Sequence, residues 1–280
     1  MAKIADYGSV VCHYTRSATA FEHILPTRRL RFSPYRLMRD PMESKEWVFG
    51  AAFFPDHFQG QDDEMRAYGE AHQAANALKS ETKLLALTTD APGYEDAGMQ
   101  EEMFGRGWAR ARMWELYGEK HRGACLVFDR DELQDELNDG LREAGAGAVY
   151  HGPVRYTQTG LAGAHISFHL DSFKAKSFGE AIADFLERHH RDLFLLKTLD
   201  WESEHEYRYL AMSEGDDYLF ARFGSSLKAV IVGEECPPWQ WQGVLDLCDE
   251  VGASAYRLHW LHEGPYPVEL ERDVAKRLSP

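Results

Sequence analysis

The chain has 280 residues, of which 44% are hydrophobic and 28% are charged, and this composition excludes a wholly disordered chain. Its net charge of -15 argues against broad, nonspecific binding of nucleic acid, which needs an extended basic surface, but it leaves room for a local basic patch. Four cysteines without C-x-x-C spacing, no visible signal peptide and no apolar run of about 20 residues predict a reduced, cytoplasmic protein that does not enter a membrane.

Short runs rich in β-branched and aromatic residues predict strands along most of the chain. In chain order these runs cover 9–14, 30–33, 83–88, 124–129, 148–156, 204–212, 218–223 and 227–233, with a further candidate at 256–260. Helical spacing of apolar residues predicts helices over 18–25, 62–79, 100–118 and 180–199, and Ser177-x-x-Glu180 forms a capping box before the last of these. Because helices and strands do not alternate regularly, we expect an α+β fold rather than a doubly wound sheet.

A histidine and a threonine stand at the first strand-to-helix junction, in the sequence Cys12-His13-Tyr14-Thr15. A histidine ring in this position can direct an N–H group at a ligand, and the threonine can bind a hydroxyl group. The alternative is a hydrogen-bonded core histidine followed by a threonine that starts a helix.

Arginines gather in one short segment that no acid interrupts between Glu22 and Asp40. The members of this cluster are Arg28, Arg29, Arg31, Arg36 and Arg39. Guanidinium groups suit phosphate oxygens because they donate two parallel hydrogen bonds. The cluster therefore indicates a phosphate site or, equally, a solvated face whose charge is balanced elsewhere.

Carboxylates gather in the segment from Trp201 to Arg208. If this segment is a strand, alternate residues share one face, and that face carries Glu202, Glu204, Glu206 and Arg208. Crowded carboxylates raise at least one pKa unless a cation compensates, and Arg208 is the local candidate. The pattern favours the lining of a cleft over a solvent-facing strand. Trp201 is expected either to cover a ligand or to join the core.

Several common sites are not indicated. The 13 histidines include no H-E-x-x-H motif and no Cys/His set, so we expect no metal. The chain has no Walker loop, no G-x-G-x-x-G and no G-x-S-x-G, which disfavours P-loop, Rossmann and α/β-hydrolase sites.

Taken together, these features resemble a bacterial and phage family known as domain of unknown function 2971. The residues that carry the resemblance are His13-Tyr14-Thr15, Leu30–Ser33, Asp40–Glu43, Met113-Trp114, Tyr117-Gly118, His121–Gly123, Lys197, Trp201, Glu204-x-Glu206-x-Arg208 and Leu227–Gly233. The resemblance covers about 10–233 of a single domain over 1–280, with a strand-rich extension at 234–280.

A second resemblance, to ADP-ribosyltransferase-like toxins, rests on His13-x-Thr15, a following strand that ends at Ser33, and Glu204-x-Glu206 late in the chain. It implies a split, strand-rich α+β core with inserted helices and NAD+ as the substrate in its cleft. It also implies cleavage of the nicotinamide–ribose bond, with transfer of ADP-ribose to an acceptor or to water, in a toxin or phage-defence effector.

This second resemblance assigns roles to individual residues. Glu206 orients the ribose and stabilises its developing positive charge, and Glu204 acts as a general base. His13 and Thr15 hold the adenosine-side ribose, and His13 is also a catalytic candidate beside Glu206 and Glu204. The remaining cofactor-binding candidates are Arg31, Arg36 or Arg208 for the pyrophosphate, Trp201 or Phe32 for stacking on a ring, and Ser33 and Tyr35 beside them. No tyrosine clearly suited to stacking on nicotinamide follows the second strand.

Two other functions remain open. One is a non-catalytic nucleotide or nucleic-acid binding module on the same scaffold, and the other is a metal-dependent hydrolase or nuclease. The expected partner is a small nucleotide, with a protein or nucleic acid as acceptor. The sequence does not predict an oligomeric state.

Overall fold

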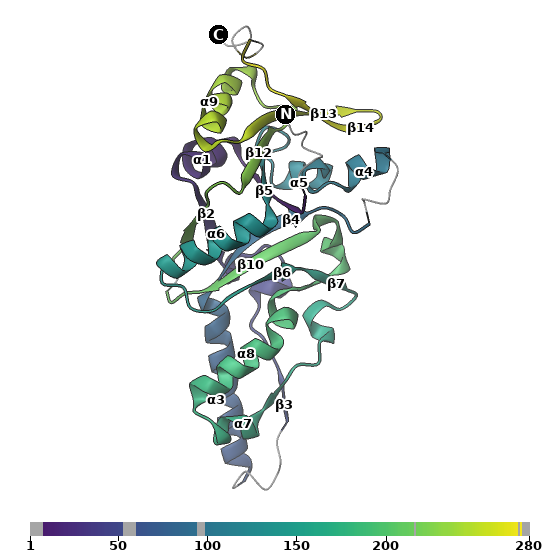
Figure 1. Cartoon of the computed structure of the whole chain (residues 1–280). Coiled ribbons are helices and arrows are strands. Elements are labelled where there is room, and N and C mark those ends of the chain that lie inside the picture. The colour runs from purple at the N-terminus through teal and green to yellow at the C-terminus, as the bar shows by residue number, and fades with distance from the viewer. Residues whose placement is uncertain (1–7, 53–59, 94–98, 216, 274, 276–280) are drawn as a thin grey trace.

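A ten-stranded sheet forms the centre of the molecule (Figure 1), in a computed structural model that describes residues 8–52, 60–93, 99–215, 217–273 and 275. Its strands are β1 (Val10–Thr15), β2 (Arg29–Pro34), β4 (Thr82–Thr89), β5 (Ala124–Asp129), β6 (Val149–Pro153), β10 (Glu206–Met212), β11 (Leu219–Arg222), β12 (Leu227–Val232), β13 (Ser254–Leu261) and β14 (Gly264–Glu269). The main path runs β11-β2-β4-β1-β5-β12-β13-β14, while β10 pairs with both β4 and β6. Two small sheets pair β3 (Gly50–Ala52) with β8 (Ser167–His169) and β7 (Arg155–Thr157) with β9 (Leu196–Thr198).

Helices cover the sheet and also extend away from it as a second lobe (Figure 1). They are α1 (Leu25–Thr27), α2 (Pro41–Ser44), α3 (Gln61–Glu81), α4 (Met99–Gly105), α5 (Ala111–Leu116), α6 (Arg130–Glu143), α7 (Leu170–Ala175), α8 (Phe178–Phe194) and α9 (Trp241–Val251). The expected α+β class is therefore confirmed. Within the described residues, no helix combines the length and the apolar character needed to span a bilayer.

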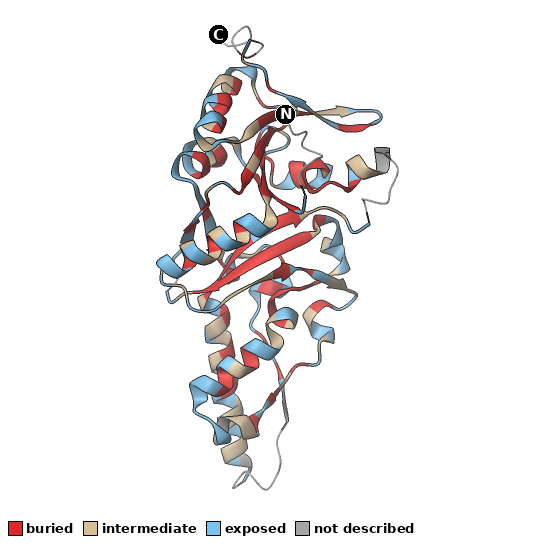
Figure 2. Ribbon diagram, in the orientation of Figure 1, coloured by how far each residue is buried: buried red, intermediate tan, exposed pale blue. Residues whose placement is uncertain are grey.

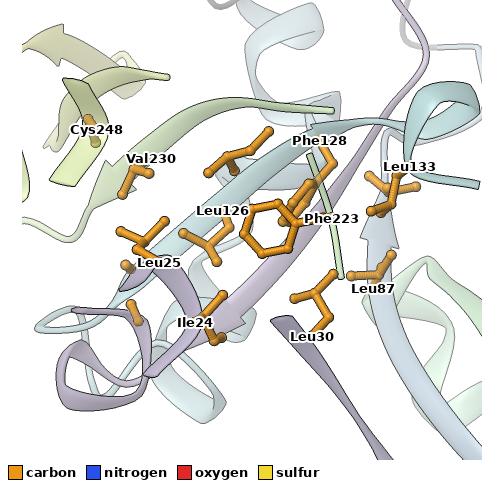
Figure 3. Close-up of a cluster of buried hydrophobic side chains, with 14 of the residues drawn as sticks. Ile24, Leu25, Leu30, Leu87, Leu126, Phe128, Leu133, Phe223, Val230 and Cys248 are labelled. Atoms are coloured by element: carbon orange, nitrogen blue, oxygen red, sulfur yellow. The ribbon is translucent and has the colours of Figure 1, made fainter. Parts of the chain in front are cut away.

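The central strands of the sheet, among them β5, β10 and β12, are buried on both faces. On one face α1, α6 and α9 pack on a core that includes Leu126, Phe128 and Val230 (Figure 3). On the other face Trp108 and Trp114 pack against β1 and β5. A third core joins α3, α7 and α8 in the second lobe. Between these cores, β10 is buried along its whole length (Figure 2).

Two expected helices are shorter than predicted because tertiary contacts replace helical hydrogen bonds. Segment 100–118 is broken around Arg106 and Gly107, where the Asp90 carboxylate binds both the Arg106 guanidinium and the Gly107 N–H. Helix α8 starts at the predicted capping box but ends at Phe194, because the following residues form β9 and pair with β7. The helices α6 and α9 were not expected from the sequence.

Strand β4 is shared between two neighbours on one edge, which splits the sheet. Its other edge pairs with β10 throughout. On the split edge, β2 pairs at Lys83 and Leu84, and β1 pairs at Thr88 and Thr89. Ala86 lies between these two pairings and is exposed, although it sits in the middle of a central strand. The separation of β1 from β2 therefore opens the sheet at Ala86.

The buried ammonium group of Lys83 ties the start of β4 to the turn after β10. Lys83 Nζ donates to the carbonyls of Glu81, Ser213 and Gly215 at 3.0, 2.9 and 2.8 Å. We expect Lys83→Met to lower the free energy of unfolding by about 2–4 kcal/mol, because three partly buried hydrogen bonds to backbone carbonyls are lost. Urea unfolding measures the change. The control Lys176→Met, which removes an exposed lysine, should lower the free energy of unfolding by less than about 1 kcal/mol. Equal losses in the two variants would show that the Lys83 hydrogen bonds do not stabilise the fold.

Candidate functional site

A cleft of about 1620 Å³ lies where β1 and β2 separate from each other along the edge of β4. Its lining comes from both of these strands, from β4 and β10, from the 3₁₀ segment Leu199–Glu204 and from the loop after α5. Ala86 reaches the cleft because no strand covers its outer edge. Distant parts of the chain thus meet in one concave space, which is the usual setting for a small-molecule site.

The floor of the cleft is organised around Arg208, whose side chain is fully buried. Its Nε and Nη2 donate to the two carboxylate oxygens of Glu206 at 2.7 and 3.0 Å. Nη2 also lies 2.5 Å from Glu43 Oε1, and Nη1 donates to the Phe194 carbonyl at 2.6 Å. Because a buried guanidinium needs partners for all its donors, this network fixes both carboxylates.

Lys197 links a further carboxylate, Glu204, to this network through Glu206. Its Nζ lies 2.8 Å from Glu206 Oε2 and 3.1 Å from Glu204 Oε2. The Tyr117 hydroxyl donates to the other Glu204 oxygen at 2.9 Å, and Lys197 Nζ lies 4.9 Å from the centre of the Trp201 ring. Three carboxyls, Glu43, Glu204 and Glu206, therefore share two cations, Lys197 and Arg208, in the floor cluster.

The pKa values of Glu206 and Glu43 are shifted in opposite directions. Burial alone would raise the pKa of Glu206, but the charges of Arg208 and Lys197 outweigh it and hold that pKa below its usual value. Burial raises the pKa of Glu43 even though Arg208 and Lys197 oppose it. Burial would lower the pKa of Lys197, but Glu206 and the other carboxylates raise it. With every group ionised, the cluster carries one negative charge in excess.

His13 sits beside the opening in the sheet. Burial lowers its pKa to about 4, with Arg31 adding to the effect, while a hydrogen bond with the backbone of Ala86 favours the charged ring. The imidazole is therefore neutral near pH 7. A neutral ring keeps one nitrogen as an acceptor and one as a donor, which suits a ligand hydroxyl.

The structure brings most of the predicted site residues together. Those that line the cleft are His13, Thr15, Arg31, Ser33, Trp201, Glu204, Glu206 and Arg208. Phe32, Tyr35 and Arg36 do not line it, which corrects their expected place in a ligand site. Phe32 points into the core because alternate residues of β2 face opposite sides, and Tyr35 is buried against Glu43.

The predicted strand face from Glu202 to Arg208 is wrong. The strand begins only at Glu206, because His205 adopts a left-handed conformation with a φ of 42° and Glu204 ends the 3₁₀ segment. Glu202 is exposed. Glu204 and Glu206 nevertheless converge, since both bind Lys197.

Three residues of the floor were not among the predicted site residues. Lys197 follows an apolar run, where a lysine is rare unless it is paired. Glu43 lies four residues after Arg39, next to the arginine cluster, and Tyr117 resembles a core aromatic. The sequence offered two indications: the unusual position of Lys197, and the presence of all three residues in the motifs that carry the family resemblance.

Metal binding gains no support from the arrangement. Among the described residues, no group of three or more histidine, cysteine, aspartate or glutamate side chains is placed to hold an ion. Glu204 and Glu206 instead bind protein cations.

Comparison with known proteins gives one match. A family described as protein of unknown function (DUF2971) matches residues 113–209, a stretch that runs from α5 to β10 and contains Tyr117, Lys197, Glu204, Glu206 and Arg208. This supports the first of the two resemblances. No curated protein and no solved structure matches the chain. The resemblance to ADP-ribosyltransferase-like toxins stays a prediction.

The opposite pKa shifts of Glu206 and Glu43 predict opposite pH trends. A lowered pKa stabilises the fold above the unfolded-state value of about 4.3, and this stability is lost as the pH falls. A raised pKa costs stability above the same value. The destabilisation caused by Glu206→Gln should therefore grow between about pH 4 and about pH 7, whereas that caused by Glu43→Gln should shrink. Urea unfolding at both pH values measures the two trends, and parallel trends would contradict the assigned charges.

Proposed function

We propose that this cleft binds NAD+ and cleaves its nicotinamide–ribose bond, with ADP-ribose passing to water or to an acceptor. The observation that carries the proposal is the charge arrangement of the cleft. Its floor gathers three carboxyl groups, Glu43, Glu204 and Glu206, around two cations, and basic side chains line the space around it. NAD+ has the complementary pattern, because a cationic ring is joined through ribose to an anionic pyrophosphate.

The chemistry matches the groups at the floor. Loss of nicotinamide breaks the C–N bond, the bonding electron pair leaves with the ring, and positive charge develops on the ribose. A preorganised carboxylate stabilises that charge without reorganisation. Glu206 is the first candidate for this role, and its bonds to Arg208 and Lys197 fix its orientation. Glu204 is positioned next to it and could accept the proton of an attacking hydroxyl group.

The polar residues at the mouth of the opening suit a ribose. His13 is neutral and Thr15 has a hydroxyl, so both can exchange hydrogen bonds with sugar hydroxyls. Trp201 lines the cleft and is half-buried, which leaves part of its ring for stacking. These contacts would bind the substrate without taking part in bond cleavage.

Release of nicotinamide from NAD+ tests the proposal. We expect wild-type protein to release nicotinamide, and Glu206→Gln to lower kcat by about 100-fold or more with a much smaller change in KM, since the lost charge acts on the transition state. Glu202→Gln is the matched control, because Glu202 is exposed and lies outside the cleft lining. Full activity of Glu206→Gln, or no release by wild type with any acceptor class, would remove the proposal.

A non-catalytic nucleotide-binding module is the second candidate. It is favoured by the pairing of both Glu206 oxygens with protein cations and by the absence of Phe32 and Tyr35 from the cleft lining. In that case ADP-ribose should bind in a salt-dependent manner, Glu206→Gln should leave its affinity unchanged, and no nicotinamide should appear. Calorimetry together with the release assay separates the two candidates.

A further inference from the structure

Six basic side chains that line the cleft form no ion pair within the described part of the chain. They are Arg16, Arg29, Arg31, Arg39, Lys120 and Arg122. Arg31 and Arg39 instead lie over the rings of Tyr218 and Tyr117, at 4.5 and 5.2 Å from the ring centres. In a chain with a net charge of -15, so many unpaired cations around one space indicate an anionic ligand.

Acidic residues also line the cleft, but within the described part of the chain none of them forms an ion pair with the six cations. Glu119 is occupied, because its Oε2 accepts hydrogen bonds from the N–H and the hydroxyl of Ser17, both at 3.0 Å. Glu115 and Glu235 are exposed, and neither forms an ion pair in the region that the structure describes. The cationic side chains therefore remain available to a ligand.

Lys120 and Arg122 belong to a loop with an unusual backbone. Three consecutive residues that are not glycine, Glu119, Lys120 and His121, have φ values of 52°, 53° and 66°. This left-handed region is disfavoured for residues with a Cβ, so a run of three persists only when the surroundings fix it. Such strain is concentrated at functional sites, and the side chain at the centre of this run, Lys120, lines the cleft.

Specific contacts hold the loop in this conformation. The Trp260 ring N–H donates to His121 Nδ1 at 3.2 Å, and the Glu235 N–H donates to the His121 carbonyl at 2.9 Å. Two glycines allow the backbone to approach closely. A Cβ on Gly123 would lie 2.2 Å from the Thr15 carbonyl oxygen, and one on Gly233 would lie 2.1 Å from that of His121. The loop is thus fixed against the end of β1, next to Arg16.

We infer that the loop Gly118–Gly123 is the phosphate-binding element of the cleft, where Lys120 and Arg122 bind the pyrophosphate of a nucleotide together with Arg16 and Arg31. The inference rests on the proposed function in taking the ligand to be a nucleotide. It replaces the earlier assignment of the pyrophosphate to Arg36 or Arg208. Arg36 lies outside the lining, and the donors of Arg208 are occupied by Glu206, Glu43 and Phe194.

Calorimetry with ADP-ribose and with adenosine tests the inference, because only the first probe carries phosphate. The double variant Lys120→Ala/Arg122→Ala should weaken ADP-ribose binding by at least about tenfold and should reduce its salt dependence, while adenosine binding stays unchanged. Arg66→Ala/Arg142→Ala removes the same charge from exposed positions outside the cleft and should leave both affinities unchanged. Unfolding midpoints of the variants confirm that they fold.

Unchanged ADP-ribose affinity in the Lys120→Ala/Arg122→Ala variant would overturn the inference. So would a wild-type protein that binds neither ADP-ribose, inorganic pyrophosphate nor a 5′-phosphorylated oligonucleotide. Tighter binding of the oligonucleotide than of ADP-ribose, lost in the double variant, would support the phosphate site and identify the end of a nucleic acid as its source.

The inference and the proposed function can fail separately. Binding of ADP-ribose that depends on Lys120 and Arg122, without nicotinamide release, supports the phosphate site and removes the catalytic proposal. Nicotinamide release with an unchanged KM in the double variant supports the catalytic proposal and overturns the phosphate site.

Discussion

The ion network around Arg208 is the interaction on which the cleft depends. A fully buried guanidinium is stable only if negative charges balance its positive charge and acceptors bind its N–H groups. The carboxyls of Glu206 and Glu43 and the Phe194 carbonyl provide both. These partners come from β10, α2 and the end of α8. One buried cation therefore connects the central sheet to the lobe of helices, and it brings the carboxyls of the floor cluster into one place.

The split of the sheet gives this network access to a ligand. If β1 and β2 formed a continuous edge along β4, Ala86 would be covered and the carboxylates would be an internal feature of the core. Because the two strands separate, polar groups from β1, β2 and β10 face one cleft. The cleft then combines an acidic floor with unpaired cations from β2 and from the left-handed loop Gly118–Gly123.

The sequence predicted the strands well and the network poorly. Runs rich in β-branched and aromatic residues located β4, β5 and β12 to within about one residue, because these strands are buried and bounded by polar residues. The sequence placed Glu204 and Glu206 close together by putting both on one face of a strand. They do lie close together, but Glu204 belongs to a 3₁₀ segment that ends before the strand begins. The pairing of Glu43 with Arg208 is long-range, and local patterns carry no information about such a contact. Lys197 lies only seven residues before Glu204, but its pairing depends on the 3₁₀ segment between them, which the sequence did not predict.

The most direct measurement is a crystal structure of the protein with bound ADP-ribose. We expect ribose density beside Glu204 and Glu206, phosphate density within hydrogen-bond distance of Lys120 and Arg122, and an intact Arg208–Glu206 pair beneath the ligand. Ligand density outside the cleft would contradict the proposed site. So would a ligand inside the cleft whose phosphates contact neither Lys120 nor Arg122 and whose ribose is remote from both glutamates.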